Sequence, residues 1–158
     1  ARSDILAWNR AATVIHGDLG AMRGIERNGI HQLFLNPAMR RMLVDWEVHA
    51  RDCVAKLRLT QANYLDDPWF NELIELLRSR SPAFSAWWDE HEVRLPHDGV
   101  KVYEHPKAGR LSFDYAILQV AGGNEVPLNL ITYVPTRDTD TQEKMEALLG
   151  RSALVLSA

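Results

Sequence analysis

The sequence predicts a single α+β domain, residues 1–158, in which helices pack over one face of an antiparallel sheet. Three observations lead to this prediction. The chain has 158 residues, a length at which one domain buries roughly 70 % of the surface that its unfolded chain exposes. Through the middle of the chain apolar residues recur every three or four positions, which is the spacing of an amphipathic helix. After Pro96 apolar residues alternate with polar ones, which is the spacing of a strand.

The composition is that of an ordinary globular protein and excludes several classes. Apolar residues make up 46% and charged residues 25%, which excludes disorder over most of the chain. The net charge is −3 and the two signs are interleaved, so we expect no direct nucleic-acid binding. The single cysteine, Cys53, excludes an internal disulfide and favours the reducing cytoplasm. No apolar run approaches the roughly 20 residues of a membrane span, and no signal peptide is visible.

The first elements expected along the chain are a strand and a short helix. The apolar run Ile5–Trp8 predicts the strand. The apolar residues of 11–15 predict the helix, with Asn9 placed to cap it and Gly17 to end it. Residues 17–29 show no clear period, so we expect a loop there with at most one helical turn.

Three helices with clear starts follow. Asn36 suits the cap position and Pro37 the first helical position, where its missing N–H costs nothing. The apolar stripe of this longest helix is Met39, Met42, Leu43, Trp46, Ala50, Cys53, Val54 and Leu57. Asp67–Pro68 and Ser81–Pro82 repeat the same start signal. The stripes of these two helices are Trp69, Phe70, Leu73, Ile74 and Leu77, then Phe84, Trp87, Trp88 and His91.

The last third predicts a three-stranded antiparallel meander followed by a helix over 141–151. The strands are expected over 101–105, 111–119 and 128–135. In the second strand Leu111, Phe113, Tyr115 and Ile117 share one face, which we expect to be buried, while the opposite face is at least partly wet.

Histidine chemistry has little support in the sequence. Pro106 and Gly109 explain His105 as part of a turn between strands, although its ring could also line a pocket. His49 and Cys53 are four residues apart, but two ligands do not make a metal site. His91 lies in DEHEV, which lacks the HExxH spacing. The GxSxG, GxxxxGK[ST] and GxGxxG patterns are absent, so we predict no catalytic residue, no metal and no cofactor.

The aromatic residues allow two interpretations. The large rings of the helices could simply fill the core. Alternatively, the alternation of bulky and small residues along Met42, Trp46, Ala50 and Cys53 could leave a groove against the sheet. An elongated apolar ligand would fit such a groove, and each buried methylene contributes about 0.8 kcal/mol.

A set of ordered segments carries a family resemblance. They are ILAWNRAA, ERN followed by QLFLNPAMRRMLVDWEVHARDCVAKLR, SPAFSAWWDEHEV, and KVYEHPKAGRLSFDYAIL. Together they resemble the MmyB-like ligand-binding domain of bacterial helix-turn-helix transcription regulators, over about Ile5 to Pro135.

The resemblance implies a PAS-like fold whose sheet and helices enclose a pocket for a fatty-acyl ligand, without catalytic residues. It also implies a homodimer, and a DNA-binding domain and first strand that precede Ala1. Arg27, Asn28 and His105 are the candidate donors to a ligand head group. The full set of expected ligand-binding residues is Arg27, Asn28, Trp46, His49, Ala50, Cys53, Trp88, His105, Leu111, Phe113 and Tyr115.

Two alternatives from other classes stay open at the level of sequence. One is a small hydrolase or isomerase that uses His49, His91 or His105 as acid or base in the same cleft. The other is a dimerisation domain without a ligand pocket, paired through the C-terminal helix or through an edge strand.

Overall fold

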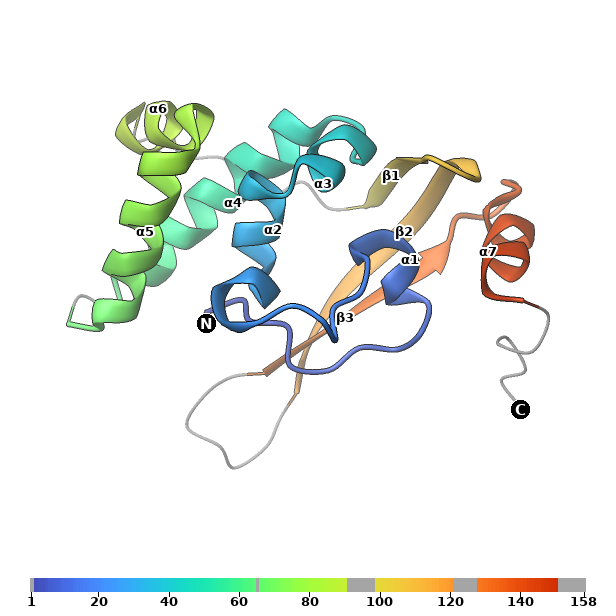
Figure 1. Ribbon diagram of the computed structural model, residues 1–158, viewed down its shortest axis with the longest axis horizontal. Coiled ribbons are helices and arrows are strands. Elements are labelled where there is room, and N and C mark those ends of the chain that lie inside the picture. The colour runs from blue at the N-terminus through green and yellow to red at the C-terminus, as the bar shows by residue number, and fades with distance from the viewer. Residues whose placement is uncertain (1, 65, 91–98, 121–127, 151–158) are drawn as a thin grey trace. The chain divides into compact units, whose positions relative to one another are not determined.

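The computed structural model describes residues 2–64, 66–90, 99–120 and 128–150 (Figure 1). It confirms the α+β class, with helices and a three-stranded antiparallel sheet in the order β1-β2-β3. The more specific PAS-like arrangement stays a prediction, as does the assignment of residues 1–158 to one domain. None of the described helices is long and apolar enough to cross a membrane.

The internal contacts group the chain into two compact units whose segments alternate along the sequence. Unit 1 comprises Ala1–Asp4, Arg23–Arg40 and Asp45–His97, and unit 2 comprises Ile5–Met22, Arg41–Val44 and Asp98–Ala158.

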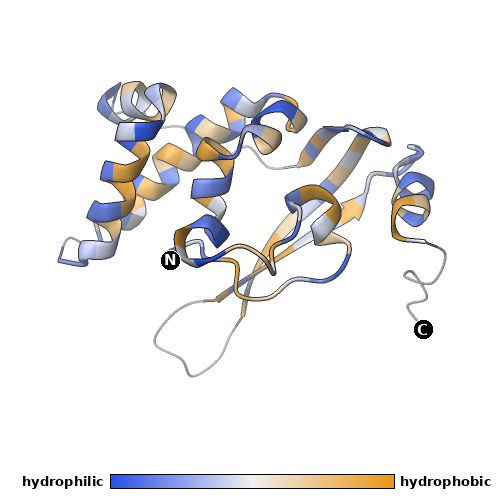
Figure 2. Ribbon diagram, viewed as in Figure 1, coloured by the Kyte–Doolittle hydropathy of each residue, from blue (hydrophilic) through white to orange (hydrophobic). Residues whose placement is uncertain are grey.

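Unit 1 is helical. Its elements are the 3₁₀ helix η1 (Gly24–Arg27), α2 (Gly29–Leu35), α4 (Trp46–Gln61), α5 (Pro68–Arg80) and α6 (Pro82–Glu90), and α3 (Pro37–Met42) connects it with unit 2. Helix α2 packs against α4 and α5, and α6 packs against the same two helices. Each helix turns an apolar stripe toward these neighbours, which Figure 2 shows as bands of contrasting colour along α5. The buried side chains include Phe34, Phe70, Leu73, Leu77 and Phe84.

The predicted starts of α5 and α6 are confirmed. The Asp67 carboxylate accepts a hydrogen bond from the Trp69 N–H at 3.1 Å, and Pro68 occupies the first turn of α5. The Ser81 hydroxyl accepts one from the Phe84 N–H at 3.2 Å. Both side chains satisfy backbone donors that have no partner inside the helix.

The prediction of one long helix after Pro37 is wrong, because α3 ends at Met42. Leu43 instead forms a bridge with Tyr103, and the Val44 N–H donates to the Val102 carbonyl at 2.9 Å. Asp45 then adopts a left-handed conformation with φ 54 before α4 begins. Backbone groups that bond to a strand cannot also continue a helical ladder.

Two other expectations in the first third also need correction. Residues 5–8 form no strand, since only Asp4 pairs, in an isolated bridge with Asn28. Residues 29–35 form α2, which the sequence pattern did not predict. The expected short helix is confirmed as α1 (Ala12–His16): the Asn9 side chain accepts from the Ala12 N–H at 2.9 Å, and Gly17 follows it with φ 74.

Unit 2 contains α1, the sheet and the C-terminal helix α7 (Thr141–Leu149). Strands β1 (Val100–His105), β2 (Gly109–Val120) and β3 (Leu128–Pro135) confirm the predicted meander. Strand β1 pairs with β2 only as far as Asp114, so the second half of β2 pairs with β3 alone among the described residues.

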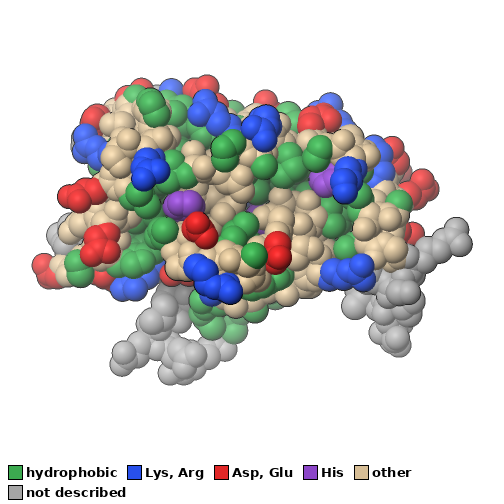
Figure 3. Space-filling model, in the orientation of Figure 1, with side chains coloured by type: hydrophobic (Ala, Val, Ile, Leu, Met, Phe, Trp, Pro, Cys, Tyr) green, Lys and Arg blue, Asp and Glu red, His purple; other side chains and the backbone are tan. Residues whose placement is uncertain are grey.

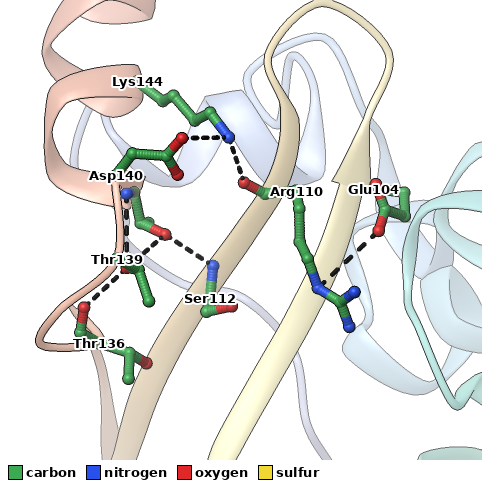
Figure 4. Close-up of polar contacts among 8 residues, drawn as sticks. Glu104, Arg110, Ser112, Thr136, Thr139, Asp140 and Lys144 are labelled. Atoms are coloured by element: carbon green, nitrogen blue, oxygen red, sulfur yellow. Dashed lines mark hydrogen bonds and ion pairs between the residues drawn. The ribbon is translucent and has the colours of Figure 1, made fainter.

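Helix α7 is attached to β2 by polar contacts (Figure 4). The Thr141 hydroxyl accepts from the Ser112 N–H at 2.9 Å, and its oxygen lies 3.0 Å from that of the Thr139 hydroxyl. Lys144 donates to the Arg110 carbonyl at 3.0 Å. Met145 and Leu149 are buried on the inner side of the helix. The predicted helix is therefore confirmed, ending at Leu149, while residues 151–158 lie outside the described part.

Candidate functional site

The sheet of unit 2 carries a cluster of polar and aromatic side chains on one face. Paired residues of an antiparallel ladder point to the same side of the sheet. The register of the three strands therefore puts one set of side chains on a common surface, which we call the tyrosine face: Lys101, Tyr103, Leu111, Phe113, Tyr115, Ile117, Ile131 and Tyr133. Ring contacts connect its members, with centroids 6.2 Å apart for Tyr103 and Phe113, 6.0 Å for Phe113 and Tyr133, and 6.2 Å for Tyr115 and Tyr133.

Burial changes steadily along this face. Tyr103, Leu111 and Phe113 are buried, in agreement with the predicted inner face. Tyr115 and Tyr133 are half-buried. Ile117 and Ile131 form a cross-strand pair and are 50% and 52% exposed. The expectation that Ile117 is buried is thus wrong, and Ile117 lies beyond Asp114, the last residue of β2 that pairs with β1 among the described residues.

Lys101 is the cation of the tyrosine face. Its ammonium lies 4.8 Å from the centre of the Tyr115 ring and 5.8 Å from that of Tyr133. It also lies 3.5 Å from the Tyr133 hydroxyl. The negative faces of the rings attract the ammonium. The side chain is half-buried, and among the described residues no carboxylate pairs with it.

The hydroxyls of Tyr103 and Tyr133 lie in hydrogen-bonding contact. Burial first, and then the neighbouring Tyr133, raise the pKa of Tyr103 well above its ordinary value. A hydrogen bond between the two hydroxyls contributes to this shift in pKa. A bond that raises the pKa of a phenol favours its protonated form, so burial and this contact keep the Tyr103 hydroxyl protonated near pH 7.

The positive charge of Lys101 also affects the pKa of His16 in α1. Burial, and after it the positive charge of Lys101, lower the pKa of His16 to about 4. Its Nδ1 atom is buried, without a hydrogen-bond partner in the described part of the chain. The imidazole is consequently neutral near pH 7, and Lys101 carries the positive charge.

His105 has the geometric role that the sequence indicates. Its Nδ1 atom accepts hydrogen bonds from the N–H groups of Lys107 and Ala108, both at 3.2 Å. Gly109 closes the turn with φ 67. Burial lowers the pKa of His105, while a hydrogen bond with the backbone of Val14 acts in the opposite direction. Both ring nitrogens thus serve the turn and its contact with α1.

The predicted aromatic residues of unit 1 pack on one another. The Trp46 ring lies 5.9 Å from Phe34 and 5.5 Å from Trp87, and its Nε1–H donates to the Leu33 carbonyl at 2.8 Å. Trp88 stacks on Phe84 at 5.4 Å. These contacts are those of a filled aromatic core, the first of the two interpretations that the sequence allows. Contact of Trp46 or Trp88 with a ligand stays a prediction.

The other residues of unit 1 that were predicted to bind a ligand differ in burial and in hydrogen bonding. Asn28 is fully buried and all its amide groups are bonded within the chain. Arg27 is half-buried in η1. On α4, Ala50 is buried while His49 and Cys53 are half-buried. A ligand role for these residues stays a prediction as well.

The candidate residues for acid–base chemistry belong to different parts of the chain. His49 belongs to unit 1 and His105 to unit 2, and His91 lies outside the described residues. Within the described ranges, no group of three or more His, Cys, Asp or Glu side chains could hold a metal ion.

The ligand-binding residues expected from the sequence include Leu111, Phe113 and Tyr115 of the tyrosine face but not Lys101, Tyr103, Ile117, Ile131 or Tyr133, nor the neighbouring His16. The signal was present in the strand 101–105, where Lys101 alternates in phase with Tyr103 and His105. A tight turn at 106–108 brings Lys101 opposite Phe113. A lysine on the inward face of a strand is unusual enough to be noticed. On the side of the molecule shown in Figure 3, positively and negatively charged side chains are interleaved.

Two comparisons with known proteins concern the chain as a whole. The family model for the MmyB-like transcription regulator ligand binding domain matches residues 1–149. A search of curated proteins gave no match.

Proposed function

The chain belongs to the family of MmyB-like transcription regulator ligand binding domains, and from this we propose that it is the effector-binding domain of a regulator that contacts DNA through a helix-turn-helix domain. The match over residues 1–149 is the observation that carries the proposal. The regulator acts in the cytoplasm, where its DNA is. Binding of a small molecule changes the affinity for an operator only if the ligand binds one conformation more tightly than another.

The ligand we propose is an elongated apolar molecule, a fatty acid or a similar acyl compound. The exposed pair Ile117 and Ile131 supports this proposal, because it continues the aromatic surface of Tyr115 and Tyr133 along the same two strands. At about 3.3 Å per residue, the strand from Tyr115 to Gln119 is about 13 Å long. A chain of a dozen carbons gains roughly 10 kcal/mol from burial before the costs of ordering are subtracted.

Native mass spectrometry of the purified protein, followed by extraction and lipid analysis, tests this proposal. We expect an acyl species to co-purify, or added dodecanoate to bind. Ile117→Asn should weaken binding, while the matched control Leu118→Asn, at the adjacent position on the opposite face, should not. A protein that carries no acyl species and does not bind dodecanoate would contradict the proposal.

We also propose that the domain forms a homodimer. The opposite face of β2 and β3, which we call the leucine face, exposes Leu118, Val120, Leu128, Leu130 and Val134. A contiguous apolar patch of this kind is typical of an interaction surface. A two-fold dimer would match the two-fold symmetry of operators read by helix-turn-helix proteins.

The oligomeric state is measured by sedimentation equilibrium at tens of micromolar. We expect a dimer mass for the unmodified chain and for Ile117→Asn, and a monomer mass for Leu118→Asn combined with Leu130→Asn. A monomer mass for all of these would reject the dimer without affecting the ligand proposal.

A further inference from the structure

The tyrosine face contains a cation whose surroundings are mostly aromatic. Lys101 is half-buried over Tyr115 and Tyr133. An ammonium has three N–H donors, and the ring faces attract the charge without satisfying these donors. The Tyr133 oxygen, at 3.5 Å, is at the limit of a hydrogen bond. A partly desolvated cation of this kind is best compensated by an anion.

The Tyr133 hydroxyl can act as a second hydrogen-bond donor beside the Lys101 ammonium. Its oxygen accepts from the Lys101 ammonium at 3.5 Å and lies in hydrogen-bonding contact with the Tyr103 hydroxyl. A phenol oxygen that accepts a hydrogen bond keeps its own proton for a further bond. Apart from the Tyr103 hydroxyl, no acceptor for that proton is found in the part of the chain that the structure describes. Lys101 and Tyr133 therefore offer two donors from adjacent atoms.

We propose that Lys101 and Tyr133 bind the carboxylate head group of the ligand, with the acyl chain directed along the exposed pair Ile117 and Ile131. The inference rests on the proposed function, because it assigns the polar end of that ligand. The two donors match the two oxygens of a carboxylate. Tyr133 and Ile131 are two residues apart on β3, so the head site and the apolar pair are about 7 Å apart.

The charges around the site favour an anion. His16 is neutral near pH 7, since burial and Lys101 lower its pKa to about 4, and thus neither repels nor neutralises the ammonium. His105 is directed to its own turn. Among the described residues of the tyrosine face no acidic side chain competes for Lys101. A neutral alcohol of equal length would use the apolar pair but would not benefit from the positive charge.

Isothermal titration with dodecanoate and dodecan-1-ol, on the full chain at pH 7.5, separates the head group from the tail. We expect dodecanoate to bind about tenfold or more tightly than dodecanol. Lys101→Met should weaken dodecanoate binding by about 10- to 100-fold, which is the range for a charge-assisted hydrogen bond. It should change dodecanol binding by less than about threefold, and this retained binding also shows that the variant is folded.

Two further variants refine the test. Lys101→Arg should retain most of the preference for dodecanoate, because the charge is kept. Tyr133→Phe should reduce dodecanoate affinity severalfold and leave dodecanol unaffected.

The two proposals fail in distinguishable ways. Equal affinity of the unmodified chain for acid and alcohol, or equal weakening of both by Lys101→Met, would overturn the carboxylate site and leave the apolar-ligand proposal standing. Absence of binding of either probe would overturn both.

Discussion

Asn28 connects three segments of unit 1 through one buried amide. Its nitrogen donates to the Arg2 carbonyl at 2.6 Å and to the Asp4 carboxylate at 2.9 Å. Its oxygen accepts from the N–H groups of Ile30 and His31 at the start of α2. The residue is at once a helix cap and the attachment of the N-terminal segment.

We predict that Asn28→Ala lowers the free energy of unfolding by about 2–4 kcal/mol. The lost cap costs about 1 kcal/mol, and the buried groups left without partners cost about 1–3 kcal/mol more. Asn36→Ala is the matched control, because the Asn36 side chain accepts from the Ala38 N–H at the start of α3 and tethers no distant segment. This control should cost about 1 kcal/mol. Urea denaturation measures both, and equal losses would contradict the role assigned to Asn28.

His16 makes stability depend on pH. Its pKa is about 4 in the folded chain, against 6.5 for an unperturbed histidine. The unfolded state therefore binds more protons between these values, so stability falls as the pH drops from 6.5 to 4. The full effect is roughly 3 kcal/mol. The lowered pKa values of His31 and His105, caused mainly by burial, act with the same sign.

We expect His16→Gln to remove most of the decrease in unfolding free energy between pH 6.5 and 4, and His31→Gln to remove less. Denaturation at a series of pH values gives these slopes. An NMR titration of the His16 ring is the direct measurement, and a midpoint near 6.5 would show that the ring is not buried in neutral form.

At the scale of elements, α7 is held by a threonine that completes the hydrogen bonding of β2. Thr141 is 1% exposed, and its oxygen accepts from the backbone N–H of Ser112. The Ser112 carbonyl in turn accepts a hydrogen bond from the Thr136 N–H at 2.9 Å. The chain after β3 thus continues the bonding of β2 with one backbone group and one side chain.

We predict that Thr141→Val lowers the unfolding free energy by about 1–3 kcal/mol, because the shape is kept while a buried N–H loses its acceptor. Amide exchange at Ser112 should become faster in the same variant. Thr139→Val is the control, since Thr139 is exposed and donates to the Thr136 carbonyl. Its effect should be below about 1 kcal/mol. Unchanged protection of the Ser112 amide in Thr141→Val would argue against this attachment.

The helix starts show which elements can be predicted from sequence. Asp67 and Ser81 cap α5 and α6 through bonds to residues two or three positions away, so a local pattern contains the whole cause. The end of α3 at Met42 has a distant cause, the pairing of Leu43 with Tyr103. The apolar period continues through Leu43 and Trp46 without a sign of this break.

The candidate site follows the same rule. Strand alternation was sufficient to place Phe113 and Tyr115 on one face, and the turn chemistry was sufficient to explain His105. The pair of Lys101 with Tyr133 depends on the register of β1 and β3 on either side of β2. That register follows from the turn for β1, but the neighbours of Tyr133 become visible only when all three strands are assembled.

At the scale of the whole molecule, the two units share one chain that passes between them repeatedly. The chain changes unit after Asp4, Met22, Arg40, Val44 and His97. No single cut therefore yields two complete units. Unit 2 needs α1 and the segment Arg41–Val44 as well as its sheet.

We predict that residues 98–158 alone do not fold, because the strand partner of Tyr103 and the helix that contacts His105 are both missing. Circular dichroism and amide NMR spectra of this fragment should be those of an unfolded chain. Mixing it with residues 1–97 should restore dispersed signals. A dispersed spectrum from residues 98–158 alone would contradict the prediction.

The bridge between Leu43 and Tyr103 joins two segments that the ribosome makes at different times. Synthesis delivers α1 and Leu43 long before β1, and the sheet is complete only when β3 has left the exit tunnel. Until then α1 and Leu43 lack the sheet against which they pack in unit 2. Pairing between residues so far apart in sequence is slow to form. A nascent chain therefore has no tyrosine face, so the proposed ligand site exists only in chains whose synthesis has passed Pro135.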